Sequence, residues 1–96
     1  MNGVTFEWDL TKAVANLRKH GVPFEEAVSV FRDVLARILD DPDHSLSESR
    51  EIIVGRSDKE RLLLVAFVER NDRIRIISAR RATPSERKDY EEGHEH

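Results

Sequence analysis

Several features that would define common protein classes are missing from this sequence. There is no cysteine among the 96 residues, which excludes disulfides, thiol nucleophiles and cysteine-ligated metals. The longest apolar run, Leu62 to Val68, has about a third of the length of a membrane span. The opening segment, MNGVTFEWDL, lacks the basic and apolar regions of a signal peptide. We therefore expect a cytoplasmic protein with no role at a membrane.

The chain also lacks the positive net charge that is typical of nucleic-acid-binding proteins, since its formal charge is −3. The acidic excess is confined to residues 83–96, which carry five acidic and two basic side chains, whereas residues 1–82 carry 14 of each. Within this balanced part, residues 73–81 contain four arginines and no acid. A local basic face is therefore possible despite the net charge.

The length and the order of patterns predict one domain over residues 1–96, because so short a chain supports a single core. There is no internal repeat or linker, and residues 93–96 are expected to fray.

The first third of the chain predicts a strand followed by two helices. Apolar residues alternate over residues 4–8, and Asp9 then precedes a helix over residues 10–20 that Gly21 can end. This helix is expected to bury its apolar residues, which are Leu10, Ala13, Val14 and Leu17. Its opposite face is expected to display Lys12, Asn16 and Lys19. Pro23 begins the second helix, whose apolar spacing continues to Phe31.

The remainder predicts four strands and a last helix. The strands are expected over residues 34–39, 50–56, 60–70 and 73–79, with a loop over 40–47 and a tight turn at 71–72. Strict alternation in the last strand places Ile74, Ile76 and Ser78 on one face. Thr83 and Pro84 predict a helix to about Glu92. The fold class is α+β, in the order strand, helix, helix, four strands, helix, with a four- to five-stranded, mostly antiparallel sheet.

Three blocks of the sequence resemble one known protein family. The first comprises Phe6-Glu7-Trp8-Asp9, Lys12, Asn16, Lys19-His20-Gly21-Val22 and Phe24-Glu25-Glu26-Ala27; the second comprises Asp41-Pro42-Asp43-His44-Ser45, Glu48, Arg50 and Gly55. The third is Arg75-Ile76-Ile77-Ser78-Ala79-Arg80-Arg81-Ala82-Thr83, followed by Glu86-Arg87 and Tyr90. Together the three blocks resemble the BrnT-type toxins. The resemblance departs at Ser49, where many relatives carry a charged residue.

This resemblance implies a RelE-like fold and an endoribonuclease toxin of a type II toxin–antitoxin system. Such a toxin cleaves RNA without a metal or another cofactor, inhibits translation, and is neutralised by a BrnA-like antitoxin. It also implies that operator DNA is bound mainly through the antitoxin complex. The alternative is a non-catalytic module that binds a partner or DNA as a co-repressor subunit.

Metal-free RNA cleavage requires a base, an acid and cations that stabilise the extra charge on the phosphate. His20 is a candidate for proton transfer and Lys19 for RNA binding, although both would also complement a helix C-terminus. Glu48 and Arg50 share one strand face and would form either an acid with a phosphate clamp or a surface ion pair.

Further candidates lie near the C-terminus. Arg75, Arg80 and Arg81 are expected to contact RNA phosphates, with a solvated face or antitoxin contacts as the alternative. Tyr90 is a candidate substrate-binding residue, with packing against the sheet as the alternative.

A metal site is not predicted. The acidic loop carries Asp41, Asp43, His44 and Glu48, but their spacing matches no ion-binding loop. His44 is expected to stabilise this loop through hydrogen bonds, with a catalytic role as the alternative.

Overall fold

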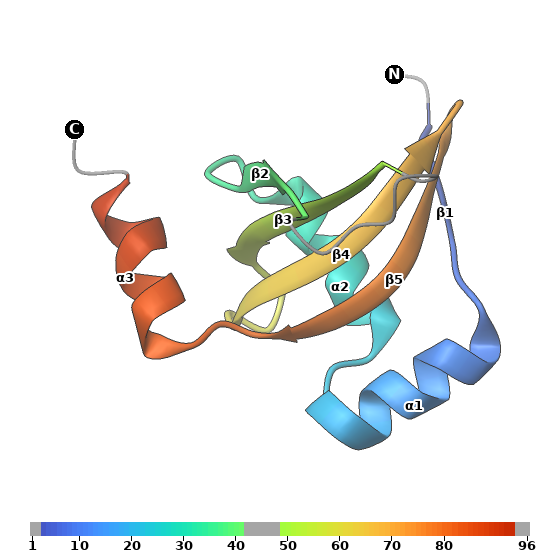
Figure 1. Ribbon diagram of the computed structural model, residues 1–96, viewed down its shortest axis with the longest axis horizontal. Helices are drawn as coiled ribbons and strands as arrows, with labels where there is room; N and C mark the ends of the chain where they lie inside the picture. Colours follow the sequence, from blue (N-terminus) through green and yellow to red (C-terminus); the bar gives the residue numbers. More distant parts are fainter. Residues whose placement is uncertain (1–2, 42–48, 94–96) are drawn as a thin grey trace.

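The computed structural model describes residues 3–41 and 49–93 and consists of one five-stranded sheet with three α-helices and a short 3-10 turn (Figure 1). The elements in chain order are β1 (Thr5–Glu7), α1 (Leu10–His20), α2 (Phe24–Ser29), η1 (Val30–Arg32), β2 (Arg37–Asp40), β3 (Arg50–Arg56), β4 (Leu62–Arg70), β5 (Arg73–Arg81) and α3 (Pro84–Glu92). This confirms the predicted α+β class and element order.

The sheet has the strand order β1-β5-β4-β3-β2. Strands β2 to β5 form an antiparallel meander, as short connections between consecutive strands favour. The first strand pairs in parallel with β5 along the other edge, from Thr5 with Arg73 to Glu7 with Arg75. The predicted mostly antiparallel sheet is therefore confirmed, with β1 as a parallel addition.

The two sides of the sheet are covered differently. On the side that we call the helix side, α1, α2 and η1 pack against the main core, whose largest buried side chains include Phe24, Leu63 and Phe67. In Figure 1, α2 lies behind the sheet. On the opposite side, which we call the open side, α3 contributes Tyr90 to a small apolar cluster with Val54 and Leu62. The open side is thus covered by a described helix only at the end where α3 lies.

An extra residue in β5 changes the facing pattern that strict alternation predicted. The register passes from Ala66 opposite Ser78 to Phe67 opposite Ile76, so Ile77 is left without a partner in a bulge. Ser78 consequently lies on the side opposite Ile76, and Ala79 is buried. The predicted grouping of Ile74, Ile76 and Ser78 on one face is therefore wrong at Ser78.

The orientation of α1 also differs from the prediction. Asn16, expected on the exposed face, is buried, whereas Leu10, Val14 and Leu17 are 75%, 56% and 50% exposed. The Asn16 side chain bonds to the backbone of β5 just beyond the part paired with β1: Oδ1 accepts from the Ala79 N–H at 3.0 Å, and Nδ2 donates to the Ala79 and Val22 carbonyls at 2.9 Å each. Satisfying these backbone groups outweighs burial of the apolar stripe.

Three element boundaries were predicted less well. The second helix changes to a 3-10 turn at Val30. Strand β2 begins at Arg37 rather than residue 34, because Asp33 closes a turn by accepting hydrogen bonds from the N–H groups of Leu35 and Ala36. Strand β5 continues to Arg81, and the predicted capping box of Thr83 and Glu86 begins α3. No described helix has the length and apolarity needed to cross a membrane.

A buried charge fixes α2 to the turn between β3 and β4. The Glu26 side chain accepts hydrogen bonds from Arg61 at both oxygens and from the Ser57 hydroxyl at 2.6 Å. These bonds, led by that from Arg61, outweigh burial and lower the pKa of Glu26. The buried carboxylate is therefore ionised and fully hydrogen-bonded, as a stable buried charge requires.

Replacement of Asn16 tests the attachment of α1. We expect Asn16→Ala to lower the free energy of unfolding by about 1–3 kcal/mol, because it leaves the backbone groups of Ala79 without partners. Thr11→Ala, at an exposed position of the same helix, is the control and should leave stability unchanged. Urea denaturation monitored by circular dichroism measures both, and equal stability of the two variants would contradict this role of Asn16.

Candidate nucleic-acid interface

The open side carries a row of residues that crosses four strands. Arg50 of β3 pairs with Val68 of β4, Val68 pairs with Arg75 of β5, and Arg75 pairs with Glu7 of β1. Because paired residues project to the same side of a sheet, Arg50 and Arg75 lie on one face with Val68 between them. We call this set the first arginine row.

A second arginine row crosses β4 at Leu64, four residues before Val68. Arg37 of β2 pairs with Val54, Val54 pairs with Leu64, and Leu64 pairs with Arg80. Arg80 belongs to this face only because the bulge at Ile77 reverses the alternation in β5. Three more arginines project to the open side by the same pairing: Arg56, Arg70 and Arg73.

The only acid that the described strands place on this face is Glu7. Its carboxylate pairs with Arg73 at 3.3 Å and with Arg75 at 3.2 Å, and Arg75 keeps half of its side chain exposed. These residues line an open hollow together with Val68, Arg70 and Asn71. The face therefore has an excess of positive charge in a concave region, which suits binding of a polyanion.

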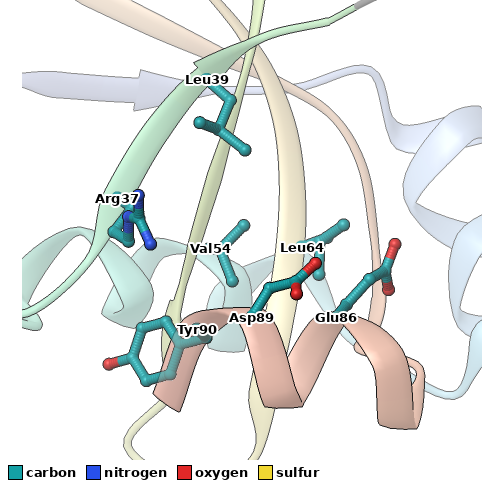
Figure 2. A pocket seen from close by; sticks show the side chains of 7 residues that line it. All are labelled: Arg37, Leu39, Val54, Leu64, Glu86, Asp89 and Tyr90. Carbon is teal, nitrogen blue, oxygen red and sulfur yellow. The ribbon is translucent and has the colours of Figure 1, made fainter. Parts of the chain in front are cut away.

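The second row is partly neutralised by α3. Figure 2 shows Glu86 and Asp89 of α3 beside a hollow with an apolar floor of Leu39, Val54 and Leu64. Glu86 accepts two hydrogen bonds of 2.8 Å from the Arg80 guanidinium. The bonds from Arg80 lower the pKa of Glu86 from 4.5 to about 2. Arg80 is thus held in place by a carboxylate of its own chain.

Tyr90 lies where α3 packs on the sheet and is 4% exposed. Its hydroxyl donates to Asp33 Oδ2 at 2.9 Å, and the Arg56 N–H donates to the same oxygen at 2.7 Å. Burial and this bond to a carboxylate raise the pKa of Tyr90 to about 12. The alternative of packing against the sheet accounts for this geometry better than substrate binding does.

Lys19 and His20 lie at the end of α1, in the last turn with Arg18. They line a shallow hollow with Lys12, Ile77 and Ser78. Ser78 is exposed and projects to the open side, since it pairs with Ala66. The hollow therefore lies beside β5 and adjoins the arginine-bearing face through Ser78, which the bulge turns to the open side.

The remaining predicted residues are distributed differently. Arg81 is exposed and projects to the helix side, since it pairs with Leu63, and so it lies opposite Arg80. Arg50 is half-buried at the start of β3. Glu48, like Asp43 and His44 of the acidic loop, lies outside the described residues.

Four arginines of the open side were not among the predicted site residues: Arg37, Arg56, Arg70 and Arg73. Alternation within β3 already relates Arg56 to Arg50, and this signal was available in the sequence. The contribution of Arg37 depends on the pairing of β2 with β3, which the sequence alone does not specify.

The chemistry available on this face is cationic. Arginine binds phosphate through two parallel hydrogen bonds and remains charged at all relevant pH values. Within residues 3–41 and 49–93, histidine and acidic side chains form no group of three or more that could hold a metal ion. A small α+β domain with an arginine-rich sheet face has the charge distribution that is typical of nucleic-acid-binding proteins.

Comparison with known proteins gives the family. Residues 8–86 match the model of the ribonuclease toxin BrnT of type II toxin–antitoxin systems. This match covers most of the chain, which therefore belongs to the BrnT family of ribonuclease toxins. A comparison with curated proteins gives no match.

The fold agrees with this family. The chain is similar to the crystal structure of the Brucella abortus ribonuclease toxin BrnT, determined at 1.1 Å, with a TM-score of 0.66 and 20% identity. The similarity covers 84% of this chain and 99% of the Brucella chain. At this identity the comparison establishes a shared fold.

The ion pair of Glu86 and Arg80 predicts a pH dependence of stability. Because the pKa of Glu86 is lower in the folded protein, its ionised form stabilises the fold above pH 4.5, and this contribution is lost as the pH falls towards about 2. Glu86→Gln should therefore be less stable than the parent protein at neutral pH, and the difference should shrink across that range. Urea denaturation at a series of pH values measures the difference, and a constant difference would contradict the prediction.

Proposed function

We propose that this chain cleaves RNA without a metal ion and binds the substrate across the open side of its sheet. The observation that carries the proposal is the first arginine row, in which Arg50 and Arg75 flank the apolar Val68 on one face. Strands two apart in a sheet are separated by about 10 Å, so the two long side chains can both contact one RNA backbone. Arg80, in the second row, extends the same cationic face.

The proposed reaction is attack of the ribose 2′-oxygen on the adjacent phosphorus. A base accepts the 2′-hydroxyl proton, the bond from phosphorus to the 5′-oxygen breaks, and an acid protonates the departing 5′-oxygen. Arg50, Arg75 and Arg80 would stabilise the additional negative charge on the phosphate. His20 or Glu48 would transfer protons, and Lys19 would position the RNA.

The hollow at the end of α1 supports the assignment of His20. Its lining joins Lys19 and His20 to Ser78 on the exposed edge of the open side. RNA lying across the arginine rows would therefore pass close to the imidazole. Arg81 projects to the other side at the end of β5, so it would contact only an RNA segment that continues past the sheet.

The biological setting proposed here follows from the family. The chain would act in the cytoplasm of a bacterium, inhibit translation by cleaving RNA, and be neutralised by a BrnA-like antitoxin. Operator DNA would be bound mainly by the complex with that antitoxin.

Cleavage of labelled RNA in excess chelator tests the proposal. The parent protein should cleave, and Arg75→Ala should reduce kcat/KM by about 100-fold or more, the usual cost of removing a group that stabilises transition-state charge. Arg32→Ala is the matched control, because Arg32 is an exposed arginine of η1, which packs on the helix side.

Three outcomes would contradict the proposal. Loss of activity in chelator that returns with added metal would refute metal independence. Normal cleavage by a folded Arg75→Ala protein would refute the assigned face. Equal losses for Arg75→Ala and Arg32→Ala would show that the effect of Arg75 is not specific to the open side.

The role of His20 is tested by His20→Gln, which keeps a polar side chain of similar size. If His20 transfers a proton, cleavage should fall by about 100-fold or more while RNA affinity is retained. The bell-shaped dependence of kcat/KM on pH should also lose one limb. Normal cleavage together with lower thermal stability would instead show that His20 only complements the C-terminus of α1.

A further inference from the structure

The outer face of α1 is apolar and is not covered by any other described part of the chain. Leu10, Val14 and Leu17, at spacings of four and three residues, are each half exposed or more. They are exposed because Asn16 turns the opposite face of the helix towards β5. A helix face with apolar residues at this spacing is the usual counterpart of an amphipathic helix.

The shape of this face also fits a helix. A shallow hollow on α1 is lined by Leu10 and by a set of four residues, Thr11, Val14, Ala15 and Arg18. These four residues stand at positions i, i+3, i+4 and i+7, which is the arrangement that receives one side chain of a facing helix in a coiled coil. Thr11 and Ala15 are small, so the hollow can accept a large apolar side chain.

The charge on α1 restricts the partner further. The helix contains no acidic residue, and its basic residues are Lys12, Arg18, Lys19 and His20. Arg18 is exposed, borders the hollow, and forms no ion pair with another described residue. A partner helix with acidic residues beside its apolar stripe would therefore be complementary to α1.

We propose that the outer face of α1 is the docking site for an acidic amphipathic helix of the antitoxin. An apolar side chain of that helix occupies the hollow between Thr11, Val14, Ala15 and Arg18, and an adjacent carboxylate pairs with Arg18. The identity of the partner rests on the proposed toxin function, whereas the surface itself rests on the geometry and charge of α1.

This site is separate from the arginine rows. The open-side arginines come from β2 to β5, whereas the hollow belongs entirely to α1. An antitoxin anchored on α1 can extend from there towards the hollow of Lys19 and His20 on another face of the same helix. Docking and cleavage can therefore be impaired independently by substitution.

The experiment measures binding of the cognate antitoxin by isothermal titration. The double variant Val14→Glu and Leu17→Glu should weaken binding by about 100-fold or more, because it removes two buried anchors and adds charge of the wrong sign. Arg18→Glu should weaken binding by about tenfold and reduce its dependence on salt. Val34→Glu is the matched control, since Val34 is an apolar residue 95% exposed elsewhere on the protein, and its affinity should match that of the parent.

RNA cleavage, circular dichroism and sedimentation are measured on the same proteins. The α1 variants should stay folded and cleave RNA like the parent; if the double glutamate variant unfolds, Val14→Ala with Leu17→Ala replaces it. Unchanged antitoxin affinity in the folded α1 variants would overturn the proposal. The proposal would also be overturned if the parent protein is a dimer and these substitutions make it monomeric without weakening antitoxin binding. The outer face of α1 would then be occupied by a second copy of this chain. If the parent protein binds the antitoxin but cuts no RNA, and the α1 variants lose this binding, the docking site is supported and only the proposed cleavage is refuted.

Discussion

The bulge at Ile77 determines how β5 serves both the core and the cationic face. Ile76 and Ala79 both face the helix side although three positions separate them, because the unpaired Ile77 shifts the alternation. Residues beyond the bulge therefore project opposite to the direction that continuous alternation would give them. Arg80 consequently joins Arg75 on the open side. Bulges frequently re-aim a side chain in this way close to functional sites.

The same part of β5 also determines the orientation of α1. The backbone groups of Ala79 lie beyond the segment paired with β1, and the buried Asn16 side chain satisfies them. This requirement rotates the polar Asn16 inwards and leaves the apolar stripe of Leu10, Val14 and Leu17 outside. In a domain of this size, covering that stripe with a partner would add appreciably to a small net stability.

Carboxylates of the chain itself organise the cationic face. Glu7 holds Arg73 and Arg75, and Glu86 holds Arg80 through two hydrogen bonds. Such pairs pre-orient flexible side chains and limit repulsion among neighbouring arginines, at the cost of some positive potential. An RNA phosphate would enter a site where the guanidinium groups are already placed, which reduces the entropy lost on binding.

The sequence by itself determined the class and order of the elements, because hydrophobic periodicity and the caps at Asp9, Gly21 and Thr83 are local signals. It also identified the family and three of the described open-side arginines, Arg50, Arg75 and Arg80. It did not determine which arginines share a face. The unpaired Ile77 reverses the alternation in β5, and pairing between neighbouring strands places Arg37 of β2 and Arg50 of β3 on the same face as the arginines of β5. Nor did it determine the orientation of α1, because the need to satisfy the backbone of Ala79, 63 positions away, prevailed over the burial of three apolar side chains.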